Sequence, residues 1–396
     1  MTTRFPDAIP VPGHVVDILR QLEAAGYETW CVGGAIRDAL LGDVHHPPQD
    51  VDLATAAPPA VVRQLFRRTI PVGIEHGTVG VLDDDGVLHE VTTFRRDVRT
   101  DGRHAVVEFG AELDDDLARR DFTVNAMAYH PLRGAWRDPF GGLADLAAQR
   151  IRAVGDAAQR FHEDRLRILR ALRFAARFDF TIDPDTWAAA MDQASDTSHL
   201  SAERVRDEWV KGLATAHSPT RLATLWARSG VAATWLPEVR SEIPSDGRIS
   251  NRDAVLVTAH FASPSAPVWR RFKGSTVDIR RAEAIDRGPA GPASADVRVV
   301  RRWLAEVGAA ADDLLTLAHW RGEGELDWID QVAGIRERGE ATSRGALAID
   351  GGDLQQAGLP PGPQIGIVLA HLLDAVIDDP ALNSRERLLA LAREIP

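Results

Sequence analysis

The chain has 396 residues, and at roughly 100–200 residues per domain this length predicts about two to four domains and excludes one small binding module. Hydrophobic residues make up 44% and charged residues 26%, which excludes a chain that is disordered throughout. The formal charge of −12 argues against a protein that coats nucleic acid over its whole surface, although a local basic groove stays compatible with it.

No apolar run approaches the roughly 18 residues of a membrane span, and the start MTTRFPDAIPVPGH lacks the basic and apolar regions of a signal peptide. We therefore expect a cytoplasmic protein with no membrane partner. Cys31 is the single cysteine, which excludes an internal disulfide and a thiolate metal cluster. A metal would be held by oxygen or imidazole, and this favours Mg²⁺ on carboxylates.

Strand patterns dominate the first third of the chain. Short apolar runs at 27–34, 51–56, 78–82 and 87–94 predict strands mixed with helices, so this part is α/β or α+β. After about residue 145 helical periodicity takes over, and we expect a mainly helical remainder. The helical patterns span 157–178, 201–216, 218–230, 298–307 and the region of 312–320. A Pro/Gly/Ala cluster at 286–296 predicts a linker or long loop, and a terminal unit centres on 351–376.

Two glycines separate the first predicted strand from a predicted helix. At such a turn, Gly33 and Gly34 let backbone N–H groups approach a phosphate, and the helix N-terminus adds positive potential. Arg37 and Asp38 follow one turn later. The pattern matches neither the P-loop nor the dinucleotide fingerprint, and an ordinary tight turn explains it as well.

Acidic residues alternate with apolar ones at the next predicted strand. Asp50 and Asp52 would point from the same strand face, about 7 Å apart, where they could share divalent ions. Glu90, on the strand pattern at 87–94, would supply a third carboxylate. Two such metals can activate a hydroxyl and neutralise a leaving pyrophosphate. The alternative is an exposed edge strand with a surface acid nearby.

Two arginines, an acid and an amide lie together in LARRDFTVNAMAYH. Arg119, Arg120, Asp121 and Asn125 suit a triphosphate and a ribose hydroxyl, and Asp121 and Asn125 have the spacing of one helix face. The alternative is an amphipathic helix that Asp121 caps.

Arginines also line one arc of the helix predicted within 161–178, opposite an apolar stripe. They are Arg167, Arg170, Arg173 and Arg177, with Asp164 one turn before the first. Few acids compensate them, so the arc suits phosphate or base contacts, although basic helix faces are usually solvated.

Six short motifs follow one another in a fixed order. They are GGxxRD at 33–38, DxD at 50–52, EVTTFR at 90–95, RRDFTxN at 119–125, DPFGG at 138–142 and EDxxR at 163–167. Together they resemble the bacterial tRNA nucleotidyltransferases, the CCA-adding enzymes, of the class shared with bacterial poly(A) polymerases. SAERVRDEW at 201–209 and the stretch at 351–366 are also similar to that class, whereas about 240–340 has no clear counterpart.

The resemblance implies a role for each motif residue. Asp50 and Asp52 would bind the metal ions, with Glu90 as the third catalytic carboxylate. The nucleotide would be held by Gly33, Gly34, Arg37, Arg119, Arg120, Asp121 and Asn125, and its base would be read by Asp164 and Arg167, with Arg170 and Arg173 nearby.

The implied reaction adds C, C and A to the 3′ end of tRNA without a template, from CTP and ATP, with Mg²⁺ as the cofactor. The implied fold is α+β: a nucleotidyltransferase head with a small mixed sheet, followed by all-α parts. We expect the head at 1–145, a base-reading neck at 146–216, a body at 217–290 and a tRNA-binding tail at 291–396.

A carboxylate and a guanidinium can select C and A together. Each of these bases has an amino group, which donates, beside an unprotonated ring nitrogen, which accepts. The carboxylate therefore accepts a hydrogen bond from the amino group, and the guanidinium donates one to the ring nitrogen. Uracil and guanine have an acceptor where C and A have the amino donor, and an N–H donor where C and A have the bare ring nitrogen. Sites built on such hydrogen bonds reject analogues by a factor of about 10⁴–10⁵.

Three alternatives stay open: a CC-adding enzyme, a poly(A) polymerase, and a binding protein on an inactive nucleotidyltransferase scaffold. The CC-adding alternative concerns segment 94–110, which corresponds to a flexible loop tied to the switch from C to A in the family. Here Arg99 stands near the family's tyrosine position, Ala105 replaces its proline, and the segment is two or three residues shorter. We still favour full CCA addition because Asp101, Gly102 and Arg103 remain.

Overall fold

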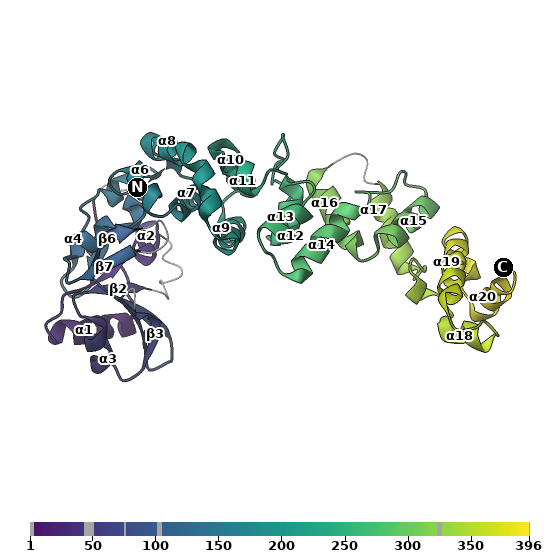
Figure 1. The fold of residues 1–396 in the computed structure, drawn as a ribbon, viewed down its shortest axis with the longest axis horizontal. Helices are drawn as coiled ribbons and strands as arrows, with labels where there is room; N and C mark the ends of the chain where they lie inside the picture. The colour runs from purple at the N-terminus through teal and green to yellow at the C-terminus, as the bar shows by residue number, and fades with distance from the viewer. Residues whose placement is uncertain (1–3, 43–50, 75–76, 101–104, 323–326, 396) are drawn as a thin grey trace. The chain divides into compact units, whose positions relative to one another are not determined.

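The computed structural model describes residues 4–42, 51–74, 77–100, 105–322 and 327–395. The chain divides into two compact units, Met1–Pro237 and Glu238–Pro396. The strand-rich part falls in the first unit, and the second unit is built from helices (Figure 1). The four-part division at 145, 216 and 290 stays a prediction.

The first unit contains a seven-stranded sheet in the order β3-β4-β5-β2-β1-β8-β9. Its strands are β1 (Thr29–Val32), β2 (Asp52–Thr55), β3 (Thr69–Gly73), β4 (Thr78–Leu82), β5 (Leu88–Thr93), β8 (Ala128–His130) and β9 (Ala135–Arg137). The pairing of β2 with β5 is parallel and the other pairings are antiparallel, so the sheet is mixed, as the α+β prediction requires. All four predicted strands are confirmed.

Buried side chains on both faces explain why the central strands form. Trp30, Val32 and Ala54 pack with Leu113 and Leu117 on one face of the sheet. Helix α1 (Gly13–Ala24) contacts β1, and α3 (Pro59–Leu65) contacts β4 and β5. The central strands are therefore covered on both sides, which fixes the position of the side chains at their ends.

Segment 94–110 forms a two-stranded ribbon of its own. Strand β6 (Arg95–Thr100) pairs antiparallel with β7 (Ala105–Phe109), with a register shift between Asp97 and Arg99. The resemblance implies a flexible loop here, and a backbone ladder takes its place because AVVEF has the β-branched composition of a strand. Residues 101–104 lie outside the described residues.

The remaining elements of the first unit are mostly helical. They are α2 (Gly34–Leu40), α4 (Leu113–Ala118), η2 (Thr123–Asn125), α5 (Gly142–Ala147), β10 (Arg150–Ile151), α6 (Ala157–Glu163), α7 (Leu166–Phe178), β11 (Thr181–Ile182), α8 (Pro184–Asp192), η3 (Ala194–His199), α9 (Ala202–Thr215), α10 (Pro219–Ser229) and α11 (Val231–Trp235). The helical pattern at 157–178 is two helices rather than one. Asp164 is extended between them, and its side chain accepts a hydrogen bond from the N–H of Leu166, which starts the second helix.

The second unit consists of helices around its own apolar clusters. They are α12 (Ala254–Phe261), α13 (Ala266–Arg271), α14 (Thr276–Arg287), α15 (Val297–Val307), η4 (Gly308–Ala310), α16 (Ala311–Arg321), α17 (Asp327–Glu337), η5 (Arg344–Ala346), α18 (Gly351–Gln356), α19 (Pro363–Asp378), η6 (Pro380–Leu382) and α20 (Arg385–Ala392). The predicted break at 286–296 is confirmed, since α14 ends at Arg287 and α15 begins at Val297. None of the helices that the structure describes is both long and apolar enough to cross a membrane.

Candidate active site

The turn at Gly33 and Gly34 follows strand β1 and lies beside strand β2, which carries Asp52. Gly33 has φ +83°, and its neighbour Val32 pairs with Asp52 across the β1–β2 ladder. A Cβ added at Gly33 would lie 3.1 Å from a guanidinium nitrogen of Arg120 and 3.2 Å from a carboxylate oxygen of Asp52. The backbone conformation and the close approach therefore both require glycine at this turn.

Two carboxylates lie at the same level of adjacent parallel strands. Leu53 of β2 pairs with Val91 of β5, so the preceding residues Asp52 and Glu90 are neighbours. Both line the same pocket. Because carboxylate oxygens are the ligands that hard divalent cations prefer, this donor set fits such an ion. The third predicted acid, Asp50, lies outside the described residues.

The segment that follows Arg119 and Arg120 is not an α-helix, so that interpretation is wrong. It contains the single 3₁₀ turn η2 and then enters strand β8. The side chain of Asp121 accepts hydrogen bonds from the N–H of Phe122 (2.8 Å) and from Nδ2 of Asn125 (2.9 Å). These local bonds stabilise a turn in place of a helix, and they still bring Asp121 and Asn125 together.

Arg37 lies almost fully buried on α2, with 3% of its side chain exposed. It donates to Asp38 through Nε (2.8 Å) and also to Oδ1 of Asn125. Its guanidinium carbon lies 5.1 and 4.7 Å from the ring centres of Phe174 and Phe178. Burial lowers the pKa of Arg37 and Asp38 opposes this, so the group is a rigid cation at the base of the pocket.

Asp121 also fixes an arginine of helix α7. Arg170 donates to its Oδ2 through Nε at 2.8 Å and contacts it through a second guanidinium nitrogen at 2.7 Å. Burial alone would raise the pKa of Asp121, but Arg170 together with the bonds from Asn125 and Phe122 holds it below the ordinary value. Asp121 is therefore an ionised carboxylate that orients an amide and a guanidinium toward one space.

The arginines of α7 face the pocket rather than open solvent. Arg173 is buried and donates to Glu208 of α9 at 2.6 Å, whereas about one third of the Arg170 and Arg177 side chains is exposed. Arg177 lies 3.2 Å from Asp38 of α2. Acids on α9 and α2 hold Arg173 and Arg177, so these cations are fixed beside the pocket although part of the face is solvated.

Asp164 and Arg167 both line the pocket, but each is held by a different partner. Asp164 accepts from Arg204 of α9 at 3.0 and 3.2 Å. Arg167 donates to Glu163 at 2.8 Å and to the carbonyl of Arg119 at 2.9 Å. Asp164 and Arg167 are therefore held in place independently of each other. This arrangement suits two adjacent hydrogen bonds to one planar ring.

Three charged side chains that position these groups were not identified from the sequence. Asp116, fully buried on α4, accepts from Arg119 at 2.9 Å and from Arg120 at 3.2 Å. Its spacing of three and four residues before that pair was a usable signal on a helix. Glu208 and Arg204 lie in the stretch at 201–209 that resembles the family, but that resemblance assigned neither residue a role.

The predicted site residues that the structure describes border one pocket of about 540 Å³. It includes every predicted site residue except Asp50, and it adds Thr78, Thr92, Arg95, Phe174 and Arg177. Carboxylates occupy the strand ends, and arginines come from α2, the segment before η2 and α7. Such a pocket suits a polyanion whose charge is shared between divalent ions and guanidinium groups.

Two family models match this part of the chain. The poly(A) polymerase head domain matches residues 29–152, and the probable RNA and SrmB-binding site of polymerase A matches residues 179–243. Curated relatives match almost the whole length. The CCA-adding enzyme of Lactiplantibacillus plantarum is 36% identical over 96% of this chain and 95% of its own. That of Streptococcus pneumoniae is 34% identical over 100% and 98%.

Solved structures agree in fold. The CCA-adding enzyme of Bacillus stearothermophilus, solved in complex with CTP, has a TM-score of 0.72 and 32% identity, with 96% of each chain covered. The Thermotoga maritima CCA-adding enzyme, complexed with tRNA, has a TM-score of 0.70 at 20% identity and supports the fold alone. The resemblance seen in the six motifs is thus confirmed, and the chain belongs to the family of CCA-adding enzymes, the tRNA nucleotidyltransferases.

Proposed function

We propose that this protein adds C, C and A to the 3′ end of tRNA, using CTP and ATP and releasing pyrophosphate. The 3′-oxygen of the tRNA would attack the α-phosphorus of the nucleotide. A new P–O bond forms there, and the bond from the α-phosphorus to the bridging oxygen breaks. The observation that carries the proposal is the single pocket that joins Asp52 and Glu90 with the arginines of α2 and α7.

Membership of this family implies a divalent metal, and we propose Mg²⁺ on Asp50 and Asp52, with Glu90 as the neighbouring carboxylate. The parallel register that puts Asp52 beside Glu90 supports this assignment. Bound ions there would supply charge neutralisation at the reacting phosphate and favour the ionised 3′-oxygen. The carboxylates would orient such ions and would offset part of their charge.

The triphosphate and ribose would lie against the glycine turn and the cations near it. Gly33 and Gly34 line the pocket at the start of α2, where backbone N–H groups would meet a phosphate, and Arg37 provides a buried charge. Arg120 and Arg119 are held by Asp116, so their orientation costs little on binding. Asp121 and Asn125 would receive the ribose hydroxyls.

The base would meet Asp164 and Arg167, with Arg170 and Arg173 behind them. Asp164 would accept from the amino group of C or A, and Arg167 would donate to the ring nitrogen. The bonds from Arg204 to Asp164 and from Arg167 to Glu163 support this division of roles, because they fix the two groups separately. No template strand is required for such a choice.

The helical tail expected at 291–396 is proposed to bind the tRNA, and the protein is proposed to act in the cytoplasm. The CC-adding alternative remains the principal competitor, since segment 94–110 departs from the family pattern at Arg99 and Ala105. A paired ribbon in that segment is stiffer than a loop, and stiffness favours that alternative. Full CCA addition stays the proposal because the curated relatives span nearly the whole chain.

The test uses the purified protein with two RNAs in one tube, a tRNA that lacks its terminal CCA and an unrelated RNA of similar length. Labelled CTP and ATP should enter the tRNA only, and a chelator should stop incorporation until Mg²⁺ is restored. Extension of both RNAs with A would favour a poly(A) polymerase. Binding of tRNA without incorporation would favour an inactive scaffold.

A further inference from the structure

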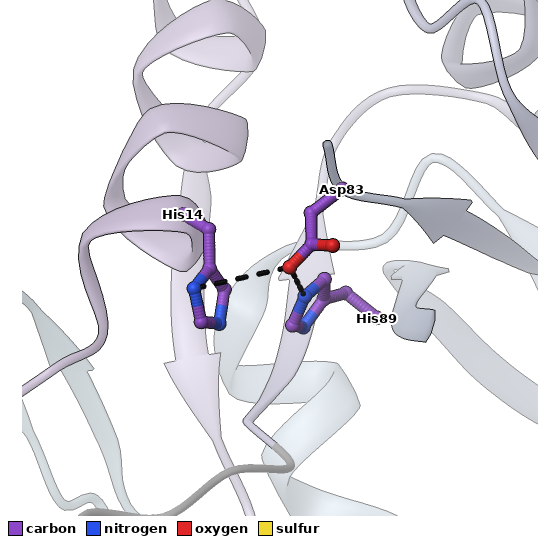
Figure 2. A group of neighbouring side chains, drawn as sticks. All are labelled: His14, Asp83 and His89. Carbon is purple, nitrogen blue, oxygen red and sulfur yellow. Dashed lines mark hydrogen bonds and ion pairs between the residues drawn. The ribbon is translucent and has the colours of Figure 1, made fainter. Parts of the chain in front are cut away.

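Two histidines and an aspartate meet on the face of the sheet that lies opposite the pocket (Figure 2). Glu90 lines the pocket, so the preceding residue of β5, His89, points to the other face. His14 comes from the first turn of α1, and Asp83 comes from the turn between β4 and β5. Oδ2 of Asp83 lies 3.1 Å from Nε2 of His89 and 3.8 Å from Nδ1 of His14.

The turn holds the carboxylate in place. Oδ1 of Asp83 accepts from the N–H of Val87 at 2.8 Å, and Arg68 donates to the backbone carbonyl of Asp83 at 2.9 Å. Only Oδ2 therefore remains for the histidines. The hydrogen bond with His89 also holds the pKa of Asp83 below its ordinary value.

The hydrogen bond between Asp83 and His89 leaves other polar atoms of this cluster without a partner in the part of the chain that the structure describes. Nε2 of His14 and Nδ1 of His89 are buried and have no hydrogen-bond partner among the described residues. The two rings lie 4.6 Å apart with an angle of 34° between them. Nδ1 of His14 and Nε2 of His89 approach the same carboxylate oxygen, so a cation among these three atoms would be bound by all three side chains.

The distances fit a small transition-metal ion. Ligand atoms from the three residues all lie within 4.8 Å of one another. A tetrahedral ion with bonds of about 2.0–2.1 Å needs ligand separations of roughly 3.3 Å, so small side-chain movements suffice. Imidazole favours zinc-class ions over Mg²⁺. His89 is fully buried but 37% of the His14 side chain is exposed, so the cluster can be reached from solvent on the side of His14.

We propose that His14, Asp83 and His89 form a binding site for a zinc-class divalent ion, separate from the carboxylates of the pocket. The ion would link the start of α1 to the β4–β5 hairpin. Since β5 carries Glu90 on its other face, the same ion would stabilise the strand that supports the pocket. Its effect is on stability, as an ion that binds only the folded state raises the unfolding temperature.

The test measures binding of Zn²⁺ to the metal-stripped full chain in excess Mg²⁺, which occupies oxygen-only sites. We expect one equivalent to bind, an increase in the unfolding temperature, and the visible spectrum of a low-symmetry site when Co²⁺ replaces Zn²⁺. His14→Gln should weaken binding at least about tenfold, as even outer contacts change metal affinity by roughly 10–100-fold. His89→Gln should act likewise.

Two controls make the outcome specific. His217→Gln changes an exposed histidine of the same unit and should leave Zn²⁺ binding unchanged. Asp52→Ala removes a pocket carboxylate and should also leave it unchanged. The proposal is overturned if no Zn²⁺ binds, or if the His14→Gln protein binds Zn²⁺ and shifts its unfolding temperature as the parent does.

Discussion

Replacement of Asp164 by alanine tests whether the pocket reads the base as proposed. The side chain of Asp164 is 30% exposed, and Arg204 holds it at 3.0 and 3.2 Å. Asp164 lies between α6 and α7, whereas the two carboxylates Asp52 and Glu90 come from strands β2 and β5. We therefore expect the variant to keep nucleotidyl transfer and to lose part of its preference for CTP over UTP.

The size of the loss follows from the bond that disappears. A hydrogen bond to a charged group contributes about 1.5–3 kcal/mol, which corresponds to roughly 10- to 150-fold in selectivity. Incorporation of UTP would also become more efficient, because the carboxylate would no longer repel the carbonyl oxygen of uracil. Arg167 remains bound to Glu163, so a residual preference from the ring nitrogen should persist.

The assay is competition of UTP and GTP against CTP on a tRNA that lacks its terminal triplet, with kcat/KM measured for each nucleotide. Asp207→Ala is the matched control, since Asp207 is an acid on α9 that is 55% exposed and pairs with Arg206 at the surface. Its selectivity should equal that of the parent. Unchanged selectivity in Asp164→Ala would refute the base-reading role.

Three further changes have defined outcomes. Asp52→Ala should lower incorporation by several orders of magnitude with tRNA affinity nearly unchanged, because the acid acts in transfer rather than in RNA binding; comparable turnover would exclude Asp52 from the metal site. Gly33→Ala should cost roughly 1–3 kcal/mol of backbone strain and reduce incorporation, since φ is +83° and the new Cβ meets Arg120 and Asp52; parent-like melting and turnover would contradict the turn geometry. The lowered pKa of Asp121 means that its stabilising effect is present above its unfolded pKa of about 3.9 and is lost as the pH falls through the lower folded pKa. In the Asp121→Asn variant the unfolding temperature should therefore fall less steeply than in the parent as the pH is lowered through that range. Equal slopes of unfolding temperature against pH in the two proteins would count against the ion pair with Arg170.

Local pattern was enough to predict four of the seven strands of the sheet, but not β3, β8 and β9. The central strands are short apolar runs, and strands β1, β2, β4 and β5 all appear where the sequence places them. Motif order then identified residues that are far apart in the chain and meet in one pocket. The strand prediction depends on residues that are close together in sequence. The prediction of the pocket residues depends on a resemblance across the whole head.

Long-range pairs and local side-chain bonds account for what the sequence did not reveal. Asp164 interrupts the pattern at 157–178 by bonding the backbone of Leu166, and Asp121 does the same before η2. Glu208 is 35 residues from Arg173, so only the packing of α9 against α7 joins them. His14 and His89 each look isolated in sequence, and the turn at Asp83 unites them.

The most direct test of the proposed function is to sequence the 3′ ends of a tRNA that lacks CCA, after incubation with the purified protein, CTP and ATP together. The account predicts ends that carry the complete CCA and no further residues. A product that stops after two cytidines with ATP in excess would contradict full CCA addition and establish the CC-adding alternative.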